Sequence, residues 1–226
     1  MIRQIAGLCG YVLLFALLLF VPAGTLHWRS AWVLLATLAA VRGVSLALLW
    51  RAQRELLEAR SSVPIPQSGQ PVADRLLLPA VMATFAGQVA FTARDVWHWH
   101  LTTVPPLWLR SIGLLAFACG WGTVYLALRA NAFALTVVRL QQDRAHEVVV
   151  DGPYAMVRHP MYMGLLGVMS GLALWLGSLA GVVAAVVPSV LLTARIVFEE
   201  RLLRARLPGY SAYAERVRWR ILPGIW

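Results

Sequence analysis

The stretch that decides the fold is MYMGLLGVMSGLALWLGSLAGVVAAVVPSVLLTARIVF, residues 161–198. It holds two apolar runs, 161–176 and 179–198, and only Gly177 and Ser178 separate them. A helix that crosses a bilayer needs about 20 apolar residues, with a range of about 17–25. The stretch therefore predicts a tight hairpin of two helices in the membrane, the first of them short or tilted.

Four further apolar runs precede this hairpin, at about 5–26, 31–50, 76–93 and 107–128, and each is long enough to cross a bilayer. The chain of 226 residues is 60% hydrophobic and 13% charged, whereas soluble domains contain about 25% charged residues. The first run is too long for the apolar region of a signal peptide, so we expect a retained helix. The sequence thus predicts an all-α polytopic membrane bundle of five to six transmembrane helices, with a C-terminal hairpin and an amphipathic tail helix.

The charge of the chain is strongly one-sided. Its twenty basic residues are all arginines, against ten acidic residues, which gives a net charge of +10. With the N-terminus inside, sixteen arginines fall on inner segments and only Arg29, Arg94 and Arg110 on outer loops. This is the positive-inside pattern of membrane proteins, so no nucleic-acid partner is needed. We expect both termini and residues 129–160 to face the cytoplasm, in an inner membrane because the composition looks bacterial.

Two inner segments and two cysteines complete this outline. The 51–75 connection contains three prolines and is predicted to be an irregular loop. The tail from Arg195, with apolar residues at 198, 202, 203 and 207, is predicted to form the amphipathic helix at headgroup level. Cys9 and Cys119 lie inside apolar runs, so we expect small buried hydrophobic residues and not a disulfide or a zinc site.

Polar side chains gather at both ends of the hairpin. Arg158 and His159 precede Pro160, which is well placed in the first turn of a helix. Free N–H groups at that helix start form a good seat for a carboxylate. Taken singly, a histidine there can be a cap and an arginine at a membrane edge can simply extend to water.

The far end of the hairpin carries Arg195, Glu199 and Glu200. Two adjacent carboxylates where a helix leaves the membrane are costly without cationic partners. Because the hairpin folds back on itself, we expect these three residues to meet Arg158, His159 and Tyr162 in one mixed-charge cleft. A cleft of this kind is a functional site by default.

These residues carry a resemblance to a known family. Gly152-Pro153-Tyr154, Arg158-His159-Pro160 with Tyr162 and Gly164, and Glu199-Glu200 after the hairpin resemble the isoprenylcysteine carboxyl methyltransferase family, whose wider group includes phospholipid methyltransferases. Residues 131–133, 138–141, 144–146 and 55–60 look like its bacterial branch. The resemblance is tight over about 129–226 and loose before that. It implies a cofactor-binding region at 129–226 and, on the acceptor side, the helices of 1–128.

The resemblance implies S-adenosylmethionine as methyl donor and S-adenosylhomocysteine as product. It assigns Arg195 to the substrate. The residues expected to contact the cofactor, with Arg158 added for the methionine carboxylate and Gln142 as an alternative to the first, are Gln141, His146, Glu147, Val148, Val149, Tyr154, Arg158, His159, Pro160, Met161, Tyr162 and Glu199. Ala145 and Met161 stand where this branch usually has smaller residues, and neither change removes a polar contact.

The acceptor is left open by the residues. A carboxylate acceptor needs no base and would pair with Arg195, whereas an amine or thiol would need deprotonation, with Glu200 or His159 the nearest candidates. Arg195 and Glu200 are therefore the catalytic candidates. We expect a lipophilic small molecule or lipid as partner, within membrane lipids and with no obligatory protein partner. The alternatives of another class are a small transporter, against which no inverted repeat is visible, and a membrane scaffold.

Two further sets of polar residues lie outside this cluster: Arg42, and the group of Asp95, His98 and His100. A charge in the middle of a spanning helix is expensive, so Arg42 either borders a substrate cavity or pairs with Asp95 or a backbone carbonyl. Asp95, His98 and His100 lie among outer tryptophans, and we expect interfacial solvation there and no metal site.

Overall fold

The computed structural model describes residues 2–62, 70–138 and 147–226. All regular secondary structure in these parts is helical. The principal helices are α1 (Ile2–Ala23), α2 (Arg29–Ala52), α4 (Val72–Arg94), α5 (Leu107–Ala130), α6 (Pro160–Leu176) and α8 (Val186–Arg206). Five helical stretches of the described chain are long and apolar enough to cross a membrane, and α6 is shorter at 17 residues. The predicted membrane bundle with a short fifth segment is confirmed.

Shorter elements connect these helices: α3 (Arg54–Ser62), the π-helix η1 (Asp95–Trp99), the 3-10 helix η3 (Gly152–Ala155), α7 (Leu179–Ala184) and α9 (Tyr210–Arg216). The 51–75 connection was expected to be irregular, yet α3 occupies its first part, because Leu56 of α3 is fully buried against the bundle. The tail helix does not start afresh at Arg195. Instead α8 runs unbroken through Arg195 to Arg206, and a separate short helix, α9, follows.

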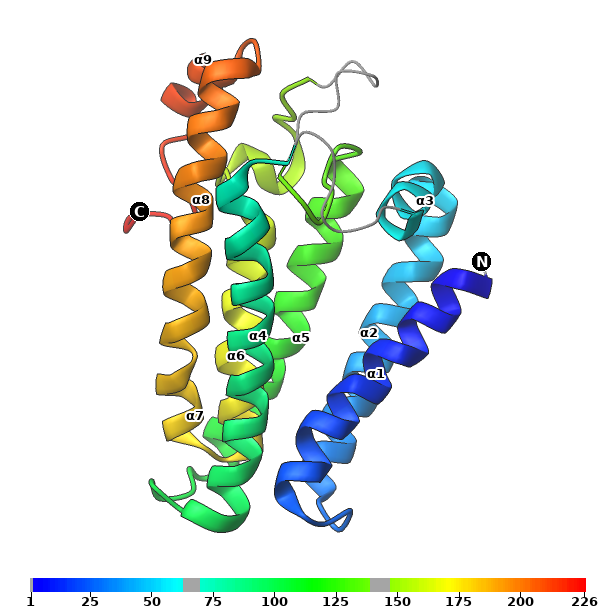
Figure 1. Ribbon diagram of the computed structural model, residues 1–226, viewed down its shortest axis with the longest axis vertical. Coiled ribbons are helices and arrows are strands. Elements are labelled where there is room, and N and C mark those ends of the chain that lie inside the picture. The colour runs from blue at the N-terminus through cyan, green and yellow to red at the C-terminus, as the bar shows by residue number, and fades with distance from the viewer. Residues whose placement is uncertain (1, 63–69, 139–146) are drawn as a thin grey trace.

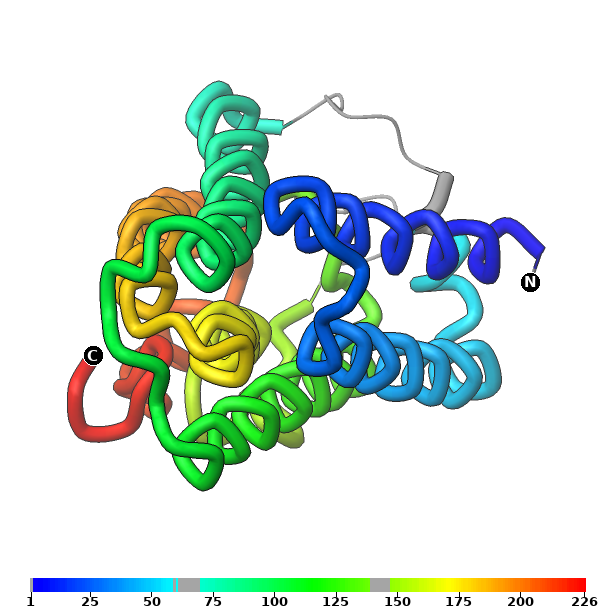
Figure 2. The backbone as a smooth tube through the Cα atoms, turned by 90° about the horizontal axis from the view of Figure 1, so that it is seen from below, coloured from blue at the N-terminus to red at the C-terminus, as the bar shows by residue number. Residues whose placement is uncertain are grey.

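The bundle has two ends of different character (Figure 1). The arginine end carries α3, α9 and the start of α6, and the tryptophan end carries residues 24–28, η1 and the turn between α6 and α7. Helices α4, α5, α6 and α8 stand together, with α6 between the others (Figure 2). Helices α1 and α2 pack side by side and diverge from this group toward the arginine end (Figure 1).

Helices α5 and α6 approach each other closely through glycines. A Cβ placed on Gly120 would lie 2.5 Å from the carbonyl oxygen of Gly164, and one on Gly171 would lie 2.6 Å from that of Gly113. Small residues let helix backbones approach in this way inside membranes. The contact fixes α6, and with it the site at its first turn.

The turn after α6 forms as expected. Gly177 caps α6 in the left-handed conformation at φ 99°, and the Ser178 hydroxyl oxygen accepts from the Gly181 N–H at 2.7 Å to start α7. Ser178 Oγ also donates to Asp95 at 2.5 Å, and Asp95 accepts from the Leu101 N–H. Asp95 is thus a structural residue of the tryptophan end. Within the described ranges no group of three His, Cys, Asp or Glu is placed to hold a metal.

The cysteines differ from expectation in one respect. Cys9 and Cys119 are free thiols, but both are exposed on the outside of the bundle and not buried. The reason is that a membrane bundle presents apolar side chains to lipid. An apolar run therefore does not by itself indicate a buried residue.

Candidate functional site

The two ends of the hairpin meet, as the sequence predicted. The Arg158 Nε donates to Glu200 Oε1 at 2.6 Å, and His159 Nε2 lies 3.2 Å from the same oxygen. Arg220, from the segment after α9, donates to Glu200 Oε2 at 3.0 Å. The side chains of Glu200 and Arg158 are each 4% exposed. Glu200 is therefore a buried carboxylate surrounded by three basic groups.

Arg158 is held by several hydrogen bonds within the protein. Its Nη1 donates to the carbonyl oxygens of Ala214, Val217 and Arg218. The backbone N–H groups of Arg158 and His159 donate to the carbonyls of Trp219 and Arg220. The cluster holds the segment after α9 against the start of α6. This geometry gives Arg158 and Glu200 a structural task, and their expected roles as a carboxylate seat and as a base stay predictions.

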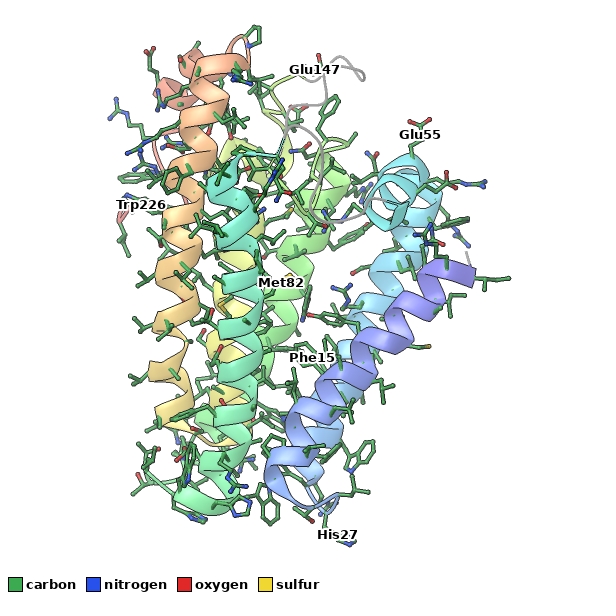
Figure 3. The ribbon with its side chains drawn as sticks, in the orientation of Figure 1. Phe15, His27, Glu55, Met82, Glu147 and Trp226 are labelled. Carbon is green, nitrogen blue, oxygen red and sulfur yellow. The ribbon has the colours of Figure 1, made fainter. Side chains whose placement is uncertain are left out.

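Beside this cluster lies a cavity, here called the Glu199 cavity. Its volume is about 120 Å³. Glu199 is half-buried at its wall, and Tyr162 donates to Glu199 Oε2 at 2.7 Å. Of the residues expected to contact the cofactor, those that line this cavity are Glu147, Val148, Val149, Tyr154, Arg158, His159, Met161, Tyr162 and Glu199. Glu147 lies at its outer rim, at the arginine end (Figure 3).

Other expected residues lie elsewhere. Pro160 is buried in the first turn of α6 but does not line the cavity. Gln141, its alternative Gln142, and His146 lie outside the described residues. The lining residues that had not been assigned to the site include Asn131, Phe133, Leu203, Leu207, Tyr210 and Tyr213. The tyrosines at 210 and 213 are spaced to share a helix face, which was the available signal.

The tyrosines of the cavity stay protonated near neutral pH. Burial raises the pKa of Tyr213 to about 12 and raises that of Tyr154 above its usual range. The Tyr213 hydroxyl donates to the Tyr154 carbonyl oxygen at 2.8 Å, which joins α9 to η3. The Tyr210 hydroxyl is buried and has no hydrogen-bond partner among the described residues. A ligand in the cavity can therefore satisfy the Tyr210 hydroxyl.

Arg195 was expected to face a substrate, which stays a prediction, and it does not line the Glu199 cavity. Its Nε donates to Asp74 Oδ1 and its Nη2 to the Thr136 carbonyl, each at 2.7 Å. Asp74, in the first turn of α4, also accepts from the Val138 N–H. No sequence pattern had linked Asp74 to Arg195, because α4 and α8 meet only in the folded bundle. The pair fixes the segment around residues 136–138, part of the cavity wall.

A second cavity, here called the Arg42 cavity, lies on the other side of the first turns of α6. Its volume is about 320 Å³. Its lining comes from five helices and consists of Tyr11, Arg42, Ser45, Leu46, Leu49, Leu57, Arg60, Trp121, Val124, Tyr125, Leu128, Met161 and Leu165. The Arg42 guanidinium carbon lies 4.4 Å from the centre of the Tyr11 ring and 4.6 Å from that of Trp121. Of the two readings of Arg42, the structure supports the cavity and not the pair with Asp95.

The two cavities are neighbours. Met161 lines both of them. Arg60, on the wall of the Arg42 cavity, donates to the carbonyl oxygen of Ala134, a residue of the Glu199 cavity. The first turn of α6 thus stands between a mixed-charge cavity at the arginine end and a larger cavity among the membrane helices.

Comparison with known proteins identifies the region that contains this site. Residues 108–207 match the phospholipid methyltransferase family. The match runs from α5 to the end of α8 and includes most of the lining of the Glu199 cavity. The match is in line with the predicted resemblance to the group that includes phospholipid methyltransferases, and it supports a membrane methyltransferase.

One curated relative is also similar. The cobalt-zinc-cadmium resistance protein CzcN of Cupriavidus metallidurans is 31% identical over 126 residues, which cover 53% of this chain and 51% of that protein. The chain thus spans about half the length of the curated relative that it matches. The name of that protein describes metal resistance, and the described residues here hold no group of three His, Cys, Asp or Glu placed to bind a metal.

Proposed function

We propose that this protein is an S-adenosylmethionine-dependent methyltransferase that acts on a lipophilic acceptor. The observation that carries the proposal is the pair of adjacent cavities with Met161 between them. One opens among polar residues at the arginine end, and the other is lined mostly by apolar side chains of membrane helices. A water-soluble donor and a lipid-borne acceptor need two such compartments side by side.

The Glu199 cavity suits the cofactor in its chemistry. The carboxylate of Glu199 matches the ammonium group of the methionine part, and Val148, Val149 and Leu203 offer apolar walls for an adenine ring. The unpartnered hydroxyl of Tyr210 supplies a further polar contact. The volume of about 120 Å³ is below the roughly 300–1,000 Å³ of small-molecule pockets. Binding therefore requires the walls to move apart.

In such a reaction the protein mainly has to align the methyl group of the donor with the acceptor. S-adenosylmethionine supplies a methyl group on a positively charged sulfur that is a good leaving group. Tyr162 holds the Glu199 carboxylate in place through its hydrogen bond, and the close packing of α5 on α6 fixes the turn that bears Met161. Holding two reactants in the right geometry is a large part of catalysis for a reaction of this type.

The proposal also covers organisation and orientation. Residues 129–226 form the donor side and the helices of 1–128 the acceptor side, which is supported by the lining of the two cavities. The arginine end would face the cytoplasm of a bacterial inner membrane, on the positive-inside pattern. Carboxylate, phospholipid amine and thiol acceptors are all compatible with this arrangement. Labelled-methyl transfer into a total lipid extract, followed by base treatment of the product, separates an ester from an amine.

Equilibrium binding of S-adenosylhomocysteine to the detergent-purified protein tests the donor site. We expect saturable binding, and a loss of about ten- to a hundredfold in affinity for Glu199→Gln, because one charge-assisted hydrogen bond is worth about 1.5–3 kcal/mol. Glu215→Gln is the matched control, since Glu215 is exposed on α9 and does not line the cavity. Absence of saturable binding to the unaltered protein would refute the proposal.

A further inference from the structure

Arg42 is a charge placed where a membrane protein can least easily carry one. It lies ten residues before the end of α2 at Ala52, which is about 15 Å along the helix at the usual rise. No described carboxylate forms an ion pair with it, and its buried Nε has no hydrogen-bond partner. Within the described part of the chain, the ring faces of Tyr11 and Trp121 compensate the charge. Intramembrane charges of this kind mark functional sites by default.

A second arginine lines the same cavity. Arg60, from α3, lies on its wall, and burial together with the nearby charge of Arg42 lowers the pKa of Arg60 to about 10. Arg60 is therefore still charged near neutral pH. The lining contains no aspartate or glutamate. The Arg42 cavity thus combines two positive charges with a wall of leucines and aromatic rings, and no charge of its own balances them.

We infer that the Arg42 cavity binds the anionic head group of an amphiphile, a carboxylate or a phosphate, and that Arg42 is the residue that selects it. The planar guanidinium presents several N–H groups in a fixed fork that matches two oxygens of such a group. The leucines of the lining take the adjoining apolar chain. A cationic or neutral head group would leave both arginines uncompensated in apolar surroundings, which is costly.

This inference rests on the proposed function, because it takes the bound amphiphile to be the methyl acceptor. It moves acceptor selection from Arg195 to Arg42. Arg195 is already paired with Asp74 and bonded to the Thr136 carbonyl, and it does not line the Arg42 cavity. Arg42 has neither kind of partner among the residues that the structure describes.

Equilibrium dialysis in a non-ionic sugar detergent tests the inference with four labelled probes of one chain length: dodecanoate, dodecyl phosphate, dodecanol and dodecylammonium. We expect saturable binding of one or both anions and none of the other two. Arg42→Gln should weaken anion binding at least tenfold, and Arg42→Lys should weaken it less, because a point charge keeps the attraction and loses the fork. Arg51→Gln removes the same charge from an exposed position on the same helix and should stay within twofold.

The better-bound anion identifies the head group as carboxylate or phosphate. Equal binding of dodecylammonium, or unchanged anion binding in Arg42→Gln, would overturn the inference. S-adenosylhomocysteine affinity, measured on the same samples, reports whether each variant is folded. If Arg42→Gln is not folded, the anion affinity of Arg42→Lys is compared with that of the unaltered protein instead. Anion binding that depends on Arg42 without S-adenosylhomocysteine binding would sink the methyltransferase proposal alone. Normal S-adenosylhomocysteine binding without anion binding would sink this inference alone.

Discussion

The surroundings of the Glu199 cavity and of the Arg42 cavity differ in how their buried charges are compensated. Around the first, Glu200 is bonded to Arg158, His159 and Arg220. Around the second, the described neighbours that stabilise the Arg42 charge are two aromatic rings. The comparison teaches that the paired charges hold the protein together, whereas an unpaired charge remains available to a ligand. Removing a charge should therefore cost much stability at Glu200 and little at Arg42.

The largest effect is expected from Glu200→Ala. The change leaves Arg158 buried without its carboxylate and also removes the partner of His159 and Arg220. Breaking a buried ion pair by removing one partner typically costs about 3–5 kcal/mol. A reversible denaturant titration in mixed micelles should show a loss of that size in the free energy of unfolding. Glu215→Ala, at an exposed position, serves as control, and equal stability of the two variants would remove the structural reading of Glu200.

A somewhat smaller effect is expected at the pair of Arg195 and Asp74, whose Nε and Oδ1 lie 2.7 Å apart between α8 and α4. Both side chains are almost fully buried. In a double-mutant cycle with Arg195→Ala and Asp74→Ala, we expect a coupling of about 2–3 kcal/mol in the free energy of unfolding, near the upper end for contacting residues. A coupling near zero would mean that the pair is not formed, and Arg195 would again be free to face a substrate.

The two cavities also differ in how much of each could be predicted from the sequence. Most of the Glu199 cavity could be predicted, because its residues fall within 131–213 and one hairpin with a two-residue turn brings them together. Glu199 and Tyr162 were predicted to meet on that ground alone, and they do. The position of the cluster around Glu200 was predicted, but the sequence does not show that Arg220 joins it or that three backbone carbonyls accept from Arg158.

The Arg42 cavity could not be assembled in this way. Its walls come from α1, α2, α3, α5 and α6, and no motif links residues so far apart in the chain. Arg42 itself was conspicuous as a charge inside an apolar run, but its neighbours Tyr11 and Trp121 depend on how α1 and α5 pack. Asp74 was missed for the same reason, since its partner Arg195 lies on α8. Local patterns gave the helices, and long-range packing decided which charges are paired.

A third prediction concerns the contact that holds α6 between the two cavities. A Cβ on Gly120 would lie 2.5 Å from the Gly164 carbonyl and 2.9 Å from the Val168 nitrogen, both of them backbone atoms that cannot turn aside. Gly120→Ala should therefore push α5 from α6 and reduce the free energy of unfolding by about 1–3 kcal/mol. Gly122→Ala is the matched control on the same helix, because nothing lies within 4 Å of its added Cβ. That variant should be neutral or slightly more stable, and similar losses in both would contradict the close contact.

The smallest effect on stability is expected from Arg42→Gln, and it completes the comparison with Glu200→Ala. The change removes the contacts of the guanidinium with two rings, worth about 0.5–2 kcal/mol in favour of arginine. It also removes a charge whose presence inside the membrane is itself costly, and it leaves no described carboxylate unpaired, since none of them pairs with Arg42. These terms oppose each other, so the free energy of unfolding should change by less than about 1 kcal/mol. The same titration that is used for Glu200→Ala measures it. A loss of about 3 kcal/mol or more would show that Arg42 is as structural as Arg158, and the distinction between the two cavities would then disappear.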